Sequence, residues 1–303
     1  MSRLSGLHIL LTYRCLSECD HCFVWGSPNQ SGVFQLRQLY GVLDQASQVA
    51  SIRSIYFEGG EPFLFYPILL EGVRAAAARG FTVGLVTNGY WGTSAEDALV
   101  WLEPMAGLLS DVSVSTDLLH SDEMVSPESR SILAACEQLS IPVGTITCNL
   151  PAGLADQTSE ARRGQSVDGG DIMLRGRAAV RLAGDMPLHP WSSFDECPHE
   201  DLEEPGRVHL DPLGNLHLCQ GLVMGNLFER PLKEIVESYE AADHPVAGPL
   251  AAGGPAELVR IYDVPHAPAY ADACHLCYIA RGYLRPRFPA LLAPDAMYGV
   301  GLT

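Results

Sequence analysis

Three cysteines near the start of the chain constrain its fold more than any other feature of the sequence. They are Cys15, Cys19 and Cys22, in the run Tyr13-Arg-Cys-Leu-Ser-Glu-Cys-Asp-His-Cys-Phe23, and their spacing lets three thiolates converge on one metal cluster. A structural zinc site or a fully ligated ferredoxin cluster takes four protein ligands. A triplet with no fourth cysteine nearby therefore predicts a four-iron cluster with one iron open to a small molecule. A zinc knuckle that borrows His21 is the alternative.

A second motif follows the triplet at the end of a short apolar run, Ser54 to Glu58. The run closes with Gly59-Gly60-Glu61-Pro62. Paired glycines at a strand end let the backbone approach a ligand closely, because no side chain intervenes. An ordinary strand-to-helix turn would show the same letters. Taken together and in this order, the two motifs resemble the radical S-adenosylmethionine (SAM) family.

The resemblance implies a cofactor and a chemistry. In that family the amino and carboxylate groups of SAM chelate the open iron of a 4Fe-4S cluster, and one-electron reduction releases a 5'-deoxyadenosyl radical that abstracts hydrogen. By resemblance, the cluster ligands are Cys15, Cys19 and Cys22. The element that binds the SAM amino group is then Gly59, Gly60, Glu61 and Pro62. The resemblance also implies an electron donor such as flavodoxin or ferredoxin.

Apolar runs of strand length alternate with amphipathic segments through the first half of the chain. The predicted strands are Leu7 to Leu11, Ile55 to Glu58, Thr82 to Val86, Asp111 to Ser115, Val143 to Cys148 and Asp171 to Leu174. The predicted helices are Gln35 to Ala50, Pro67 to Arg79, Ala95 to Glu103 and Pro127 to Leu139. Six β/α units in series predict an α/β fold with a parallel sheet. The resemblance sharpens this to a partial (β/α)6 TIM-like barrel over residues 1–185.

Polar residues close the predicted strands, at the edge where parallel sheets bind their ligands. By resemblance, Asn88 and Ser115 are candidate SAM contacts, and His21 stacks near the adenine. Asn88 could equally cap a helix, and Ser115 could bond its neighbours. Arg175 pairs with the SAM carboxylate or the substrate, or forms a salt bridge in the barrel rim.

The second half of the chain carries four further cysteines. They are Cys197, Cys219, Cys274 and Cys277. Residues 207–219 alternate around a turn, which predicts a β-hairpin. A hairpin followed by a cysteine resembles the SPASM/Twitch extension of radical SAM enzymes, so residues 186–303 are expected to hold a second, auxiliary 4Fe-4S cluster. Zinc on four thiolates is the alternative. The Gly- and Pro-rich stretch Ala241 to Pro265 predicts an irregular loop.

Two cysteines lie outside both groups. Cys136 is expected to be a buried small hydrophobe. Cys148, on the fifth predicted strand, could return a hydrogen atom to a substrate radical or simply pack in the core.

An auxiliary cluster that no substrate coordinates can accept an electron, which implies net oxidation and a deprotonating base. The candidates for that base are Asp117, His120 and Arg175.

Three functions remain open at this point. The favoured one is a radical SAM enzyme that oxidises a small polar substrate with the help of the auxiliary cluster. The second is a maturase that modifies a ribosomally made peptide. The third is a noncatalytic iron-sulfur scaffold, against which the complete Gly-Gly-Glu-Pro element and cysteine triplet count.

The net charge and the cysteine content limit the classes of binding partner and the cellular compartment that the sequence predicts. With 36 acidic against 19 basic residues, the net charge of -17 opposes binding to a nucleic acid backbone. No apolar run has the length of a membrane span, and no signal peptide precedes the first predicted strand. Nine cysteines without an export signal favour metal binding over disulfides. These features predict a cytoplasmic protein that binds neither membrane nor nucleic acid.

Overall fold

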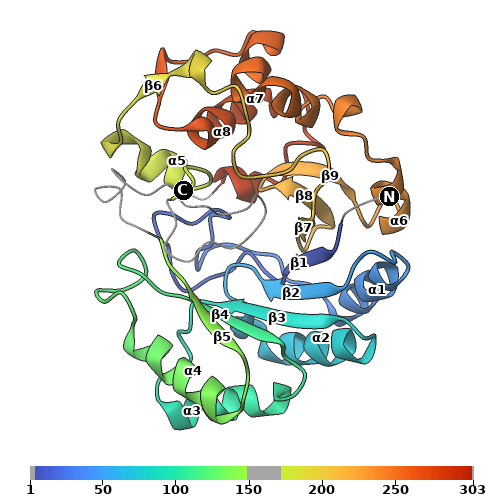
Figure 1. The fold of residues 1–303 in the computed structure, drawn as a ribbon, viewed down its shortest axis with the longest axis vertical. Helices are drawn as coiled ribbons and strands as arrows, with labels where there is room; N and C mark the ends of the chain where they lie inside the picture. Colours follow the sequence, from blue (N-terminus) through green and yellow to red (C-terminus); the bar gives the residue numbers. More distant parts are fainter. Residues whose placement is uncertain (1–3, 149–171, 302–303) are drawn as a thin grey trace.

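The computed structural model describes residues 4–148 and 172–301, and its centre is one eight-stranded sheet (Figure 1). The strand order is β5-β4-β3-β2-β1-β7-β8-β9. The strands from the first half of the chain are β1 (Gly6–Leu10), β2 (Ser54–Glu58), β3 (Thr82–Thr87), β4 (Asp111–Ser115) and β5 (Val143–Ile146). The others are β7 (Arg207–Leu210), β8 (Asn215–Cys219) and β9 (Leu222–Asn226). Because β1 pairs with β7, the sheet joins the two halves of the sequence.

Helices cover the outer face of the parallel strands, as the alternating pattern predicts. They are α1 (Leu36–Ser47), α2 (Tyr66–Ala78), α3 (Ala95–Leu102) and α4 (Pro127–Gln138), in the lower half of Figure 1. Leu7, Ile9 and Phe57 are fully buried in the main core with residues of these helices. Since side chains alternate along a strand, His8 and Glu58 lie on the opposite face. The polar strand residues therefore face the inside of the fold.

The later helices lie beside β7 to β9 in the upper half of the view. They are α5 (Ala178–Arg181), α6 (Leu232–Ser238), α7 (Ala247–Tyr262) and α8 (Ala273–Leu284), and a two-stranded sheet pairs β6 (His189–Pro190) with β10 (Ala269–Tyr270). The irregular loop predicted for 241–265 is therefore wrong over most of its length. Gly253 and Gly254 only kink α7, because Ala and Leu on both sides favour helix and Pro255 is tolerated in the first turn after the kink.

The sixth predicted strand is not part of the sheet. Residues 172–174 lie outside any strand, and Asp171 lies outside the described residues. Leu174 packs in a small separate core with Ala178, and its amide donates to Asp272 Oδ2 at 3.3 Å instead of joining a ladder. The sixth parallel strand of the described sheet is β7, which runs parallel to β1.

The predicted hairpin is present as β7 and β8, and Asp211 holds its turn. Asp211 is fully buried and accepts hydrogen bonds from Leu213 N, Asn215 N and Asn215 Nδ2, each at 2.9 Å. Tyr13 donates its hydroxyl to Asp211 at 2.8 Å, so the turn is tied to the loop after β1. Burial alone would raise the pKa of Asp211, but the bonds to His217, Asn215 and Tyr13 outweigh it and hold the pKa below its ordinary value.

We expect Asp211→Asn to destabilise the protein by about 2–3 kcal/mol, because a buried charged acceptor loses several bonds. A carboxyl whose folded pKa is lowered stabilises the protein above its unfolded pKa and ceases to do so as the pH falls towards the folded value. The difference in unfolding free energy between wild type and variant should therefore shrink below about pH 4. Urea denaturation at pH 7 and pH 3 measures it. Asp201→Asn, in a surface turn, is the control and should change stability by less than about 0.5 kcal/mol.

Within residues 4–148 and 172–301, none of the helices combines the length and the apolar character that a membrane crossing requires.

Candidate functional site

The loop after β1 brings two cysteines of the triplet together around Gly26. A Cβ added to Gly26 would lie 3.2 Å from Cys15 Cβ, 3.6 Å from Cys22 Sγ and 3.5 Å from Gly60 Cα. Gly26 N donates to Cys22 Sγ at 3.2 Å, and Ser17 N donates to Cys15 Sγ at 3.4 Å. Hydrogen bonds from backbone N–H groups to sulfur stabilise the thiolate form of cysteine that a cluster requires. Burial, by contrast, raises the pKa of the free Cys15 thiol to about 12, so a bound metal would have to displace its proton.

Arg177, which was not among the predicted site residues, holds this loop in place. Its guanidinium donates to the carbonyl of Cys19 at 2.8 Å and to the carbonyl of Gly26 at 2.7 Å. Its own amide donates to the carbonyl of Cys22 at 2.9 Å. Three hydrogen bonds from one residue hold the loop at Cys19, Cys22 and Gly26. The thiols are therefore positioned before any cluster binds.

The two glycines at the end of β2 let that strand pass directly beneath the cysteine loop. Gly60 N donates to Thr12 O at 2.7 Å, and Glu61 N donates to Arg14 O at 2.8 Å. A Cβ on Gly60 would lie 2.2 Å from Arg14 O, and Gly59 has a φ of +148°. The close approach predicted for these glycines therefore includes an approach to the protein's own backbone.

We expect Gly60→Ala to cost roughly 3 kcal/mol, because its methyl group meets a backbone carbonyl that cannot move without displacing the cysteine loop. Thermal or urea unfolding of the anaerobic protein measures the loss. Gly41→Ala is the matched control, since Gly41 lies in α1 with open space around it and should gain about 0.5–1 kcal/mol. Equal stability of the two variants would contradict the close approach at Gly60.

Glu61 connects the end of β2 to the end of β3. Its fully buried carboxylate accepts from Phe63 N at 3.0 Å, Asn88 N at 2.8 Å and Thr87 Oγ1 at 3.0 Å. Burial raises the pKa of Glu61 to about 7 although these bonds oppose the shift. Asn88 in turn donates to Cys15 Sγ at 3.4 Å, while its side-chain oxygen caps Tyr90 N at 3.1 Å. Asn88 thus bonds within its own turn instead of capping a helix, and it also reaches the cysteine triplet.

His21, Asp117 and His120 lie together beside the triplet. The His21 and His120 rings meet edge to face at 4.6 Å, and His120 Nδ1 is 2.9 Å from Asp117 Oδ1. His120 also bonds the thiol of Cys19. His21 Nδ1 is buried without a hydrogen-bond partner in the described residues, and burial beside His120 lowers the pKa of the ring to about 4. A neutral imidazole with an unpaired nitrogen is open to a polar ligand at this position.

Two other predicted residues lie at or just beyond the ends of neighbouring strands. β5 ends at Ile146, so Cys148 lies two residues beyond the strand predicted to hold it; its amide donates to Asp117 Oδ2 at 3.0 Å, and it packs against the small core around Leu174. Ser115 ends β4 and pairs with Ile146 of β5. Cys136 is fully buried in α4, as predicted.

The Arg175 side chain forms a salt bridge, which was one of its predicted roles. Its Nη1 is 2.7 Å from Glu200 Oε1 and 3.3 Å from Cys219 Sγ. Both side chains of the ion pair are less than one tenth exposed. Arg175 is therefore part of the second cysteine group.

The four later cysteines line one cavity. The cysteines are Cys197, Cys219, Cys274 and Cys277. Burial raises the pKa of the Cys277 thiol to about 12, so this thiol is protonated when no metal is bound. Arg281, only 1% exposed, bonds Cys277 and donates to Gln220 O at 2.9 Å. Four thiolates beside two buried arginines, Arg175 and Arg281, form a donor set that fits an iron-sulfur cluster, and zinc would also fit it.

Residues 9–135 match the radical SAM superfamily. A putative peptide biosynthesis protein of Bacillus subtilis (strain 168), YydG, is 28% identical over 126 residues, which are 41% of this chain and 40% of that protein. A cofactor-modifying protein for tungsten-containing aldehyde ferredoxin oxidoreductase from Pyrococcus furiosus is 33% identical over 84 residues, 27% of this chain and 23% of its own length. The chain thus matches less than half of either curated relative.

Among solved structures, native anSMEcpe with bound AdoMet covers 94% of this chain and 97% of its own, with 13% identity and a TM-score of 0.49. BtrN in complex with AdoMet and 2-DOIA covers 78% of this chain and 82% of its own, with 15% identity and a TM-score of 0.46.

Proposed function

We propose that this chain, whose residues 9–135 match a radical SAM domain, is an enzyme that oxidises its substrate by hydrogen abstraction. The observation that carries the proposal is the convergence of Cys15, Cys22 and Gly60 around Gly26. When bound, a 4Fe-4S cluster and SAM would supply a 5'-deoxyadenosyl radical. Cys15, Cys19 and Cys22 would hold that cluster, and the element Gly59 to Pro62 with Asn88, Ser115 and His21 would hold SAM.

The second cysteine group supports the oxidative half of the proposal. Cys197, Cys219, Cys274 and Cys277 would hold a second 4Fe-4S cluster, which would supply an electron acceptor. Arg175 and Arg281 place positive charge beside these four thiolates, which offsets the cost of burying the negative charge. The proposal assigns SAM binding to residues 1–185 and the auxiliary cluster to residues 186–303.

For the deprotonating base we favour the pair of Asp117 and His120 over Arg175; burial lowers the pKa of His120, but Asp117 and Cys19 outweigh it and raise the pKa to about 9, so the ring would act as a base above neutral pH. The 2.9 Å hydrogen bond between His120 Nδ1 and Asp117 Oδ1 fixes the imidazole ring of His120, as a carboxylate does for a catalytic histidine. Arg175 is held in its ion pair with Glu200.

Two classes of substrate are compatible with this chemistry. A small polar molecule is the first, and its oxidation needs no thiol donor. Modification of a ribosomally made peptide is the second, and the relationship to a putative peptide biosynthesis protein favours it. If Cys148, beside Asp117, instead returned a hydrogen atom to a peptide radical, the net change would be an epimerisation without oxidation, and the mass of the peptide would not change.

The test is anaerobic reconstitution followed by incubation with SAM and dithionite. We expect about eight irons per chain and release of 5'-deoxyadenosine. Mass spectrometry of candidate alcohols and short peptides would then detect the loss of two hydrogens. Iron without any 5'-deoxyadenosine, with or without those candidates, would favour the noncatalytic scaffold. Four irons together with zinc would remove the electron acceptor.

A further inference from the structure

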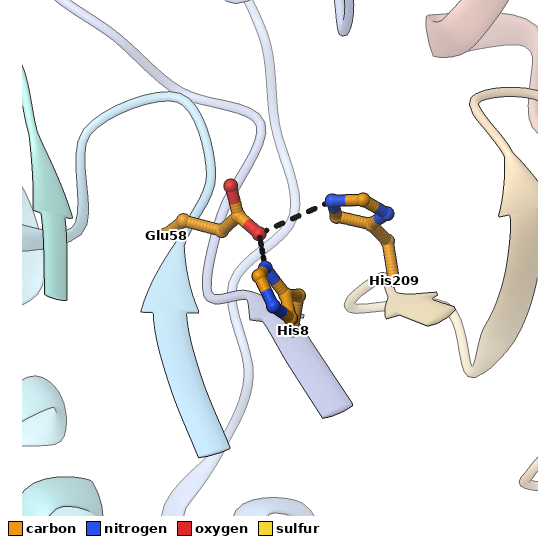
Figure 2. Close-up of side chains that lie close together, drawn as sticks. All are labelled: His8, Glu58 and His209. Atoms are coloured by element: carbon orange, nitrogen blue, oxygen red, sulfur yellow. Dashed lines mark hydrogen bonds and ion pairs between the residues drawn. The ribbon is translucent and has the colours of Figure 1, made fainter. Parts of the chain in front are cut away.

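Three side chains on adjacent strands form a buried cluster that the proposed reaction does not use. His8 lies on β1, Glu58 ends β2 and His209 lies on β7, and Figure 2 shows all three pointing toward one another. His8 Nδ1 is 2.7 Å from Glu58 Oε1, and His209 Nε2 is 3.2 Å from the same oxygen. One donor atom from each residue lies within 4.8 Å of the other two. Two imidazoles and a carboxylate at this spacing are a ligand set of transition metals.

The sheet holds these donors in place. His8 and His209 are direct register partners across the parallel pair of β1 and β7. Glu58 is the register partner of Leu10 on the other side of β1, and Tyr56 stacks on the His8 ring at 4.8 Å. Donors carried by hydrogen-bonded strands need little rearrangement to bind an ion. The cluster is therefore organised in advance, unlike a set of surface side chains.

The charge of the cluster is incompletely balanced. The Glu58 side chain is 9% exposed, and within the described residues its ion-pair partners are His8 and His209, with no lysine or arginine within 4.0 Å. The buried carboxylate of Glu200 has Arg175 at 2.7 Å instead. A buried carboxylate without a permanent cation is costly. A divalent ion at the cluster would supply the missing positive charge.

We propose that His8, Glu58 and His209 bind a divalent transition-metal ion, for which Zn²⁺ is the reference. Three protein ligands leave one position of a tetrahedral ion open to water or to an oxygen of a ligand. The site lies close to the cysteine triplet, because the ring centroid of Phe23, which follows Cys22, is 6.2 Å from that of His209. The inference does not depend on SAM cleavage.

The test uses the full chain with its iron-sulfur clusters reconstituted, so that the cysteines are occupied. After equilibration with zinc chloride and desalting, we expect one zinc per chain in addition to the iron. The zinc X-ray absorption spectrum should show nitrogen and oxygen at about 2.0–2.1 Å and no sulfur near about 2.3 Å. His8→Ala, Glu58→Gln and His209→Ala should each weaken zinc binding at least roughly tenfold. His189→Ala, an exposed histidine on β6, is the control and should retain the zinc.

Two results would overturn the site: no zinc retained by the wild-type protein, or zinc surrounded by sulfur. Equal zinc binding in the Glu58→Gln variant and the wild type would do the same. Iron content and circular dichroism of each variant show whether it has folded. Where a variant has not folded, the zinc X-ray absorption spectrum of the wild-type protein alone tests whether the ligands are nitrogen and oxygen.

Discussion

Replacement of Cys15, Cys19 and Cys22 by alanine should abolish 5'-deoxyadenosine formation and lower the iron content from about eight to about four per chain. Cys15 and Cys22 converge around Gly26, where Cys22 accepts a hydrogen bond from Gly26 N–H and Cys15 accepts one from Ser17 N–H. Alanine at these positions removes the sulfur ligands of the proposed cluster. On the assignment proposed above, the remaining four irons would be those held by the cysteines that line the second cavity. Iron and sulfide analysis, with chromatography of the nucleoside product, measures both effects.

Cys136→Ala is the matched control for this variant. Cys136 is fully buried in α4 and belongs to neither cysteine group. It should keep about eight irons and full product formation, with only the modest loss of stability that follows removal of a small core atom. Retention of all the iron in the triple variant would show that the triplet binds no cluster. A loss of iron in both variants would point to general misfolding.

Arg175→Met should destabilise the protein by about 3–5 kcal/mol, because it leaves the buried carboxylate of Glu200 without its partner at 2.7 Å. Arg207, whose Nη2 is 4.0 Å from the other oxygen of Glu200, compensates only part of the lost positive charge. The double variant Arg175→Met/Glu200→Gln should recover most of the loss, since removal of both charges removes the unpaired one. Urea unfolding under anaerobic conditions measures all three proteins.

The control for Arg175→Met is Arg74→Met, which breaks an exposed pair with Glu71 of similar length, 2.8 Å. Its side chains are 49% and 42% exposed, so the loss should stay below about 0.5 kcal/mol. If Arg175→Met cost no more than this control and yet abolished product formation, Arg175 would act on SAM or substrate, and its assignment as a structural partner of Glu200 would be wrong.

Much of the fold could be predicted because its signals are local. Each of β1 to β5 has its own alternation or apolar run, and the hairpin of β7 and β8 carries its turn residues with it. The position of β7 beside β1 left no such trace, because pairing between strands so distant in sequence depends on the whole core. Residues 172–174 have the apolar pattern of a strand, but they pack in the small core around Ala178.

The candidate site shows the same division. The cysteines and Gly59 to Pro62 are recognisable from their spacing, and their cofactor roles stay predictions. Arg177 was missed because its bonds to Cys19 and Gly26 join residues 158 and 151 positions apart in the sequence. His8 and His209 were missed because a single histidine on a strand carries no signal until the strands are placed side by side.

The pairing of β1 with β7 also has a consequence for folding during synthesis. Ser5 and Gly206, at the start of this pairing, are 201 residues apart in sequence. Until β7 has been synthesised, one edge of β1 has no partner, and an unpaired apolar edge is a template for aggregation. Nascent chains stalled before residue 207 should therefore depend on chaperones, and a fragment that ends at residue 185 would keep that edge exposed permanently.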